Sequence, residues 1–274
     1  MSGTSPDEMR DRPTSGGGAP SLPLVDVLVA TSDSAATLGR ALRSIRAHVA
    51  VRRLIVVDRP GSDDTVAIAR RFGAEVHSEA EGLGKARNLA LSSAETEPVL
   101  FVDSDVEIVR GDFYPRALEE FGRPGTAAVV GMSVGHRFRY GLPLGLTLIG
   151  RRWALGAAIP DRALGRETYY LQRAARRDGL IVRYVPDAMV HYGTYRAVPS
   201  WPEFQGAAIR RSSGWNPREL AYAFVVVALM HMNSGRPRHL LYTPVFWLKL
   251  ARGFLSPDRW ERIDRSRVLL GRAG

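Results

Sequence analysis

Short runs of apolar, mostly β-branched residues alternate with amphipathic segments along the first part of the chain. The apolar runs are typical of buried strands and cover residues 25–31, 54–57, 74–77 and 99–102. The helical spacing of apolar residues predicts helices between these runs, over residues 36–48, 65–72 and 85–93. Strands that alternate with helices through short connections predict an α/β fold with a doubly wound, mostly parallel sheet flanked by helices.

Aspartates follow three of the predicted strands, at the end where open parallel sheets bind their ligands. These residues are Asp33, Asp58, Asp103 and Asp105. Asp103 and Asp105 lie two apart, so an extended segment places both side chains on one side of the chain. Two converging carboxylates can hold a hard divalent cation and leave positions open for phosphate oxygens. For an isolated Asp-X-Asp, an ordinary polar strand end is the alternative interpretation.

The segment from Gly82 to Arg87 is a candidate phosphate-binding site. Gly82 and Gly84 allow a close backbone approach, and the helix predicted from Lys85 offers N–H groups beside two cationic side chains, Lys85 and Arg87. The segment lacks the third glycine of a dinucleotide fingerprint, and the chain has no GxxxxGK[ST] run, which excludes NAD-binding enzymes and P-loop NTPases. Upstream, the Asp58 carboxylate could accept a hydrogen bond from a base or a ribose, or only cap a turn.

The second half of the chain is less regular. A helix is predicted over residues 112–121 and strands over 127–131 and 181–185, with a broken apolar stretch at 140–160 that is either buried or forms an apolar surface able to meet a lipid. Two apolar segments follow, at residues 221–230 and 240–255. Each is too short for a bilayer span or is interrupted by Pro244, and arginines flank both. This favours helices in a membrane interface, with helices packed on the core as the alternative.

Composition narrows the class of protein. The 274 residues are 45% hydrophobic and 24% charged, which suits one large globular domain with an appendage. The chain has no cysteine, which excludes disulfides and thiolate metal sites. Residues 1–22 are rich in Gly, Ser and Pro and predict a disordered leader rather than a signal peptide, so we expect a cytoplasmic protein. The net charge of +10 favours phosphorylated or anionic partners, but no basic motif interleaved with aromatic residues supports nucleic-acid binding.

Four of these features occur together in the order found in family 2 glycosyltransferases of the GT-A fold, which the chain resembles from residue 25 to about residue 195. They are the first strand, the acidic loop from Asp58 to Thr65, the helix opened by residues 84–88, and Asp103-Ser104-Asp105. The chain departs from the family at Arg59 and Pro60, where a second acid and a glycine are usual. The resemblance implies a GT-A domain over residues 23–197, with a nucleotide-sugar half (23–107), an acceptor half (108–197) and a C-terminal helical region (198–274).

The resemblance also implies the activity and the site. The donor would be a UDP- or GDP-sugar, bound with Mn²⁺ or Mg²⁺, and the acceptor a hydroxyl on a glycan or a lipid-linked molecule. The donor-binding residues would be Thr31, Asp33, Asp58, Gly84, Lys85, Arg87 and Asp103. The metal ligands would be Asp103, Asp105 and His191, the last of which follows a predicted strand.

Residues 165–173 resemble the family's Gly-Glu-Asp-X-Asp-Leu segment beside the acceptor. Arg166 and Tyr169 replace acids there, so Glu167 is the remaining carboxylate. A hydroxyl must lose its proton as it attacks the sugar, which makes Glu167 the candidate base of an inverting transfer. A carboxylate that only stabilises a helix N-terminus is the alternative. A polyprenyl-phosphate acceptor would not need this base, and a non-catalytic nucleotide-binding module is a further alternative.

Overall fold

The computed structural model describes residues 22–160, 166–192 and 201–257 of the chain. The strands are β1 (Val25–Ser32), β2 (Val51–Arg59), β3 (Glu75–Ser78), β4 (Val99–Val102), β5 (Val106–Ile108), β6 (Thr126–Ser133), β7 (Leu146–Ile149) and β8 (Ile181–His191). The helices are α1 (Ala35–His48), α2 (Thr65–Arg71), α3 (Leu83–Ser93), α4 (Phe113–Phe121), α5 (Arg151–Gly156), α6 (Glu167–Arg177), α7 (Trp201–Ser213), α8 (Pro217–Asn233) and α9 (Pro237–Leu255).

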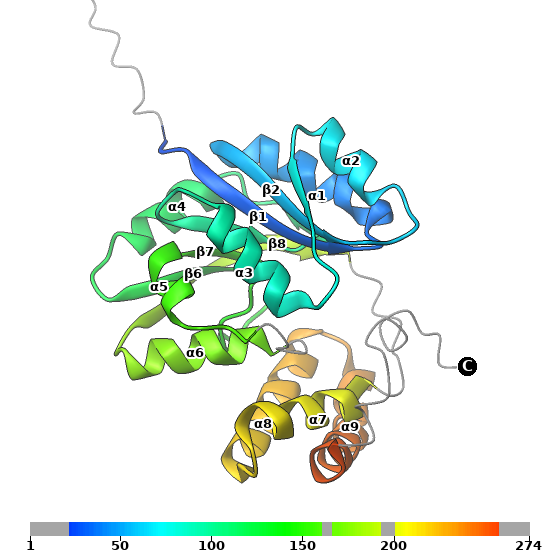
Figure 1. Ribbon diagram of the computed structural model, residues 1–274. Coiled ribbons are helices and arrows are strands. Elements are labelled where there is room, and N and C mark those ends of the chain that lie inside the picture. The colour runs from blue at the N-terminus through cyan, green and yellow to red at the C-terminus, as the bar shows by residue number, and fades with distance from the viewer. Residues whose placement is uncertain (1–21, 161–165, 193–200, 258–274) are drawn as a thin grey trace, which may run out of the picture.

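The described strands form one eight-stranded sheet with the order β3-β2-β1-β4-β7-β6-β8-β5 (Figure 1). β1 to β4 pair in parallel, as the alternation of strands and helices predicted. β7 is antiparallel to both β4 and β6, and β5 is antiparallel to β8. The predicted α/β fold is therefore confirmed, with a mixed sheet that is parallel from β1 to β4. β7 comes from the broken apolar stretch, and all four of its residues are buried.

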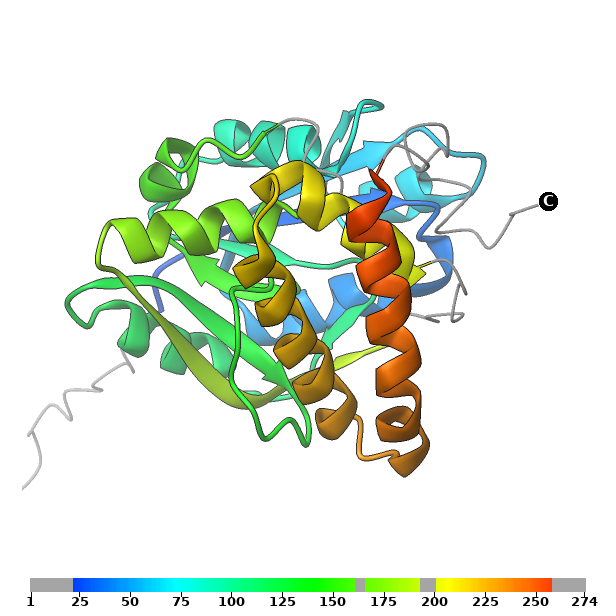
Figure 2. The ribbon, with the colours of Figure 1, turned by 90° about the horizontal axis from the view of Figure 1, so that it is seen from below.

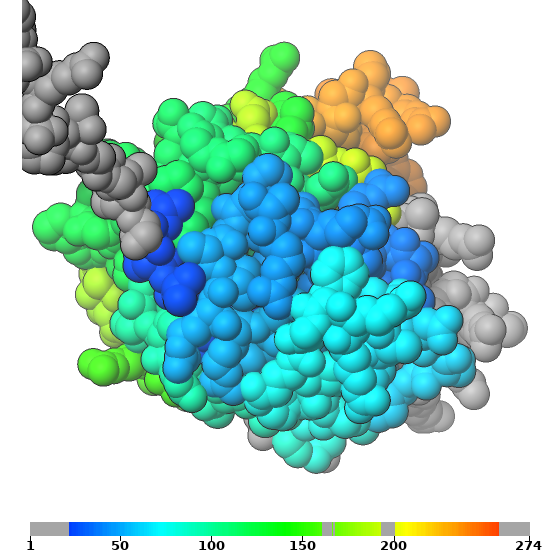
Figure 3. All heavy atoms as spheres, turned by 90° about the horizontal axis from the view of Figure 1, so that it is seen from above, coloured from blue at the N-terminus to red at the C-terminus, as the bar shows by residue number. Residues whose placement is uncertain are grey.

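Helices cover both faces of the sheet, which explains why the central strands are continuously apolar. On β1, Val27 and Val29 pack with one core cluster and Leu28, between them, packs with the other. The first cluster lies under α1, α2 and α4. The face of the molecule that covers it is formed largely by the first part of the chain (Figure 3). The second cluster lies against α3, α5 and α6.

The helices α7, α8 and α9 lie together beside the sheet, below it in Figure 1 (Figures 1 and 2). Asn233 at the end of α8 accepts hydrogen bonds from the backbone N–H groups of Arg137 (2.9 Å) and Phe138 (3.1 Å) in the loop after β6. Gln172 of α6 donates a hydrogen bond to the Tyr222 hydroxyl on α8 at 3.1 Å. Within the described part of the chain, no helix is both long enough and apolar enough to cross a bilayer.

The predicted limits of the leader and of the C-terminal region fall at residues that the structure does not describe. The leader, residues 1–22, lies outside the described residues except for Leu22, and so does the boundary between residues 197 and 198. These limits therefore stay predictions. The helical character expected after the boundary agrees with α7 to α9.

Two glycines allow α7 and α9 to approach at backbone distance. A Cβ atom built on Gly206 would overlap the backbone carbonyl oxygen of Leu250, and one built on Gly253 would overlap that of Glu203. Rotation of a side chain cannot relieve such an overlap because both partners are backbone. We expect Gly206→Ala and Gly253→Ala each to destabilise the packing of α7 on α9 by about 1–3 kcal/mol.

Thermal unfolding and hydrogen exchange of the α7 and α9 amides would measure this effect. Gly156, in α5, is the matched control, because a Cβ there meets nothing within 4 Å. Gly156→Ala should leave stability unchanged or raise it slightly. Equal behaviour of the three variants would contradict the importance of the close approach.

Candidate active site

Asp103, Asp105 and His191 form a compact cluster at the end of β4. β5 begins directly after Asp105 and pairs with β8, so that Val106 lies opposite His191. This pairing places the His191 Nε2 3.3 Å from the Asp105 Oδ1. One ligand atom from each of the three side chains lies within 4.8 Å of the others. The structure thus brings together the three residues that the sequence analysis assigned to the metal.

The surroundings of this cluster disfavour the charged form of Asp105. Partial burial raises the pKa of Asp105, and the nearby Asp103 raises it further, while His191 acts in the opposite direction. Arg87 is buried under the cluster, with its Nη2 3.4 Å from the Asp103 Oδ1. The Asp103 backbone N–H donates to the Gly145 carbonyl at 2.8 Å, which fixes the turn after β4.

Hydrogen bonds join the loops that follow β1, β2 and β4. The hydroxyl groups of Ser34 and Ser104 lie 3.0 Å apart, and the Ser34 N–H donates to the Thr65 hydroxyl at 2.8 Å. Asp63 accepts hydrogen bonds from the N–H groups of Ala35 (2.9 Å) and Thr65 (3.0 Å). Although burial opposes them, bonds from Thr65 and Ala35 lower the pKa of Asp63. The strand-end loops are therefore linked to one another, and Ser104 links them to the metal-ligand candidates.

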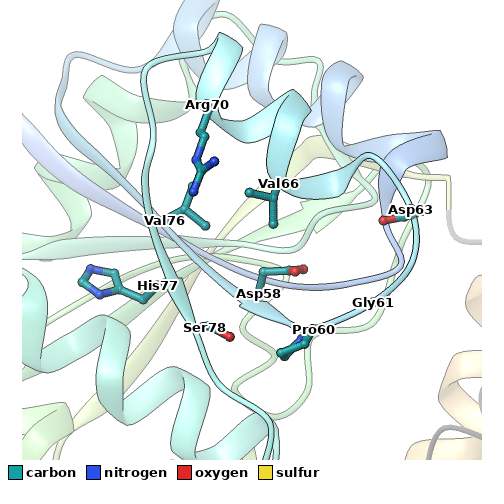
Figure 4. A pocket seen from close by; sticks show the side chains of 9 residues that line it. All are labelled: Asp58, Pro60, Gly61, Asp63, Val66, Arg70, Val76, His77 and Ser78. Carbon is teal, nitrogen blue, oxygen red and sulfur yellow. The ribbon is translucent and has the colours of Figure 1, made fainter.

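A pocket of about 240 Å³ opens at the ends of β2 and β3 (Figure 4). Its wall includes Asp58 from β2, Arg70 from α2 and His77 from β3, and Pro60 and Gly61 close one side. In Figure 4 the Arg70 side chain extends from α2 toward Val76, while Asp58 lies below Val66. Arg70 and His77 were not predicted from the sequence. Nothing in the local pattern separates Arg70 from the other arginines of the chain, but the position of His77 near a strand end was an available signal.

Asp58 is almost completely buried, with 5% of its surface exposed. Its partner in the β1–β2 register is Thr31, whose hydroxyl donates to the Asp58 Oδ1 at 2.6 Å. Burial raises the pKa of Asp58, the hydrogen bond from Thr31 lowers it, and the carboxylates of Asp63 and Asp33 raise it. A buried carboxylate of this kind gains from any ligand N–H that reaches it.

The Asp33 carboxylate lies against Gly61, a residue of the loop after β2 that lines the same pocket. Its φ of 46° is in the left-handed region, and a Cβ atom built on Gly61 would overlap the Asp33 carboxylate. Gly61 thus permits the two loops to touch. Of the predicted phosphate-binding residues, Gly84 is buried in the first turn of α3, and Lys85 contacts Glu81 and lies 3.8 Å from Glu79.

Glu167 is the first residue of α6, and only its backbone is described; Gly165 of the same motif lies outside the described residues. The neighbouring Arg166 lies 4.5 Å from the centre of the Tyr169 ring and 3.4 Å from the Glu219 carboxylate on α8. Burial lowers the pKa of Arg166, and the Glu219 charge raises it. The start of α6 is therefore attached to the C-terminal helices.

Residues 26–155 match the sequence model of the glycosyl transferase family 2. This part of the chain is therefore similar to family 2 glycosyltransferases. The match includes Asp58, Asp103 and Asp105 and ends before Glu167 and His191.

Solved structures with the same fold extend the likeness along the chain. The mannosyltransferase PcManGT from Pyrobaculum calidifontis, in complex with GDP-Man and Mn²⁺, superposes with a TM-score of 0.65 at 16% identity, over 89% of each chain. Glucosyl-3-phosphoglycerate synthase from Mycobacterium tuberculosis, in complex with Mn²⁺, UDP and its product, gives a TM-score of 0.56 at 22% identity, over 70% of this chain and 80% of that one. Mannosyl-3-phosphoglycerate synthase from Rubrobacter xylanophilus gives 0.52 at 18% identity, over 69% and 73%.

The raised pKa of Asp58 predicts a pH-dependent gain of stability in Asp58→Asn. The folded protein holds the Asp58 proton more tightly than the unfolded chain, so this group stabilises the fold below its ordinary pKa of 3.8 and loses that contribution as the pH rises through its raised pKa. Asparagine keeps an acceptor for Thr31 and carries no charge. We therefore expect the Tm of Asp58→Asn, relative to wild type, to be higher at neutral pH than near pH 3.8.

Asp112→Asn is the control of opposite sign. Arg110 and Arg116 lower the pKa of this exposed carboxyl to about 2. Its contribution is present above the ordinary pKa and is lost as the pH falls toward 2, so Asp112→Asn should lose stability at neutral pH. A parallel response of the two variants would exclude the environment of Asp58 as the cause.

Proposed function

We propose that the protein is a metal-dependent, inverting glycosyltransferase that moves a sugar from a UDP- or GDP-sugar to a hydroxyl acceptor on a glycan or a lipid-linked molecule. The observation that carries this proposal is the cluster of Asp103, Asp105 and His191 within a family 2 fold. The cluster is connected through Ser104 and Ser34 to the loops that border the pocket at Asp58. A nucleotide-sugar donor needs both the pocket and the cluster, because the pocket binds its nucleobase and the metal at the cluster binds its diphosphate.

The donor half supplies the base and phosphate contacts in this proposal. Asp58 accepts a hydrogen bond from a ring N–H, which uracil and guanine both carry, so the carboxylate alone selects neither. Thr31 orients Asp58, and Asp33 borders the sugar side of the pocket. Arg87, beside Asp103, and the first turn of α3 with Gly84 and Lys85 balance the charge of the diphosphate.

The donor set of the cluster fits a divalent metal. Two carboxylates and one imidazole leave positions open for phosphate oxygens, and the imidazole favours Mn²⁺ over Mg²⁺. When bound, the metal neutralises charge on the departing nucleoside diphosphate. Two solved structures of the same fold contain Mn²⁺ with a nucleotide or a nucleotide sugar, which supports this assignment.

In this proposal the acceptor half supplies the general base of the reaction. Glu167, at the start of α6, removes the proton from the acceptor hydroxyl as this oxygen attacks the anomeric carbon from the face opposite the leaving group. An ionised polyprenyl phosphate would attack without such help. A lipid-linked acceptor would be met at the inner face of the cell membrane, where the basic C-terminal helices would be in contact with lipid.

Donor binding predicts a metal-dependent thermal shift. Mn²⁺ with UDP or GDP should stabilise the protein by about 2.7 kcal/mol when the ligand is present at about one hundred times its Kd. Asp105→Ala should abolish the metal-dependent part, since it removes one ligand. Asp112→Ala, which removes a carboxylate directly before α4 instead, should keep the full shift. Differential scanning fluorimetry would measure both. The absence of any shift with either nucleotide would refute the proposal.

Glu167→Gln separates the acceptor classes. If Glu167 is the base, transfer to a hydroxyl acceptor should fall by about 10²–10⁴-fold, while the thermal shift with Mn²⁺ and nucleotide is kept. Glu119→Gln on α4 is the control and should retain full turnover. Unchanged turnover in Glu167→Gln would favour the phosphate acceptor. Binding without turnover on any acceptor by the wild type would favour the nucleotide-binding module.

A further inference from the structure

The outward side of α9 is apolar, whereas the solvent side of a surface helix is normally polar. Leu241, Val245 and Leu248 follow one another at helical spacing, and Leu255 continues the row two turns later. Leu241 is 82% exposed, Leu248 72% and Leu255 63%. The opposite side of the helix is already occupied by its packing on α7, through Leu250, Gly253 and Phe254. The exposed row is therefore a second apolar face that the described structure leaves uncovered.

α8 packs on the side of α9 that faces away from this row, where Thr243 is hydrogen-bonded to His231 and the Trp247 indole donates to the Phe224 carbonyl. It forms an antiparallel hairpin with α9, and both helices lie on the side of the molecule that faces the viewer in Figure 2. Val225, Met230 and Met232 of α8 are about half exposed. We call the exposed row of Leu241, Val245, Leu248 and Leu255 the apolar hairpin face. Four exposed apolar side chains in one row differ from the scattered single apolar residues that are normal on soluble proteins.

Residues 220–257 contain no aspartate or glutamate, so the charged side chains of this segment are all cationic. One acidic side chain comes from α7, where the Glu203 carboxylate lies 3.7 Å from Arg252. Arg236 and Arg238 are exposed at the start of α9, and the exposed Arg252 interrupts the apolar row near its end. Arginine flanking exposed leucine is the arrangement of helices that lie in the interface of an anionic bilayer, with the leucines among the acyl chains and the guanidinium groups at the headgroups.

We infer that the apolar hairpin face docks on the surface of an anionic lipid bilayer, with α9 parallel to the membrane plane. Charge complementarity decides in favour of lipid over a second copy of the chain, because two copies would bring the same arginines together, whereas phosphate headgroups neutralise them. This docking would make an anionic membrane the partner surface of the proposed transferase. It needs neither metal nor donor, so it can be tested apart from the catalytic proposal.

Vesicle co-sedimentation of the full chain tests the inference without metal or nucleotide. We expect binding to vesicles of phosphatidylcholine mixed with phosphatidylglycerol, and at least about tenfold weaker binding to phosphatidylcholine alone. The double variant Leu241→Gln/Leu248→Gln removes apolar contacts, and Arg236→Gln/Arg238→Gln removes charge. Each should weaken binding to the mixed vesicles by about tenfold or more, and added salt should weaken the wild type but have less effect on the arginine variant.

Leu24→Gln/Ile181→Gln is the matched control, since it replaces two exposed apolar residues outside the C-terminal helices. It should bind vesicles as the wild type does, and circular dichroism should show all three variants folded. Equal binding by wild type and the leucine variant would overturn the inference. So would a dimer in light scattering that dissociates on Leu241→Gln/Leu248→Gln without any vesicle binding, because a second copy would then cover the face. Retained nucleotide-induced thermal shifts in a non-docking variant would separate this result from failure of the transferase proposal.

Discussion

The pairing of β5 with β8 is the interaction on which the geometry of the candidate active site depends. β5 has three residues, and its ends Val106 and Ile108 are buried. The Ile108 N–H donates to the Ser44 hydroxyl of α1 at 3.0 Å, so β5 is held from the helix layer as well as from the sheet. Asp105 precedes β5 and His191 ends β8. The cluster therefore exists only when β5 pairs with β8, a strand that lies much later in the sequence. The metal-ligand candidates therefore depend on completion of the whole sheet.

The pocket at Asp58 lies where the covered strands end. Because both sheet faces are covered, the central strands are mostly apolar and most of their polar groups gather where the parallel strands end. Thr31 and Asp58 meet there because β1 and β2 are in register, and Ser34 and Ser104 meet because β1 lies beside β4. The raised pKa of Asp58 is the cost of placing a carboxylate in such a position. The fold holds the Asp58 carboxylate at this position although burial removes it from water, so a ligand can reach it without rearrangement of the protein.

Patterns of apolar residues were sufficient for the parallel strands and their helices, because these segments are long and strongly patterned. β5 was missed because three residues after Asp105 give too little periodicity to detect. β7 was not predicted as a strand either, and its antiparallel orientation was out of reach, because all four of its residues are buried and pairing direction leaves no mark on such a short run. Asp103 and Asp105 were identifiable from their spacing, whereas the wall of the pocket was not: Arg70 reaches it only through the packing of α2 beside β3.

The contact between Arg166 and Glu219 joins the first turn of α6 to α8. Since Asn233 fixes the other end of α8 to the loop after β6, this helix is held at both ends by the catalytic domain. The position of α8 and the position of the first turn of α6 therefore depend on each other, so a shift of the C-terminal helices would also strain the start of α6.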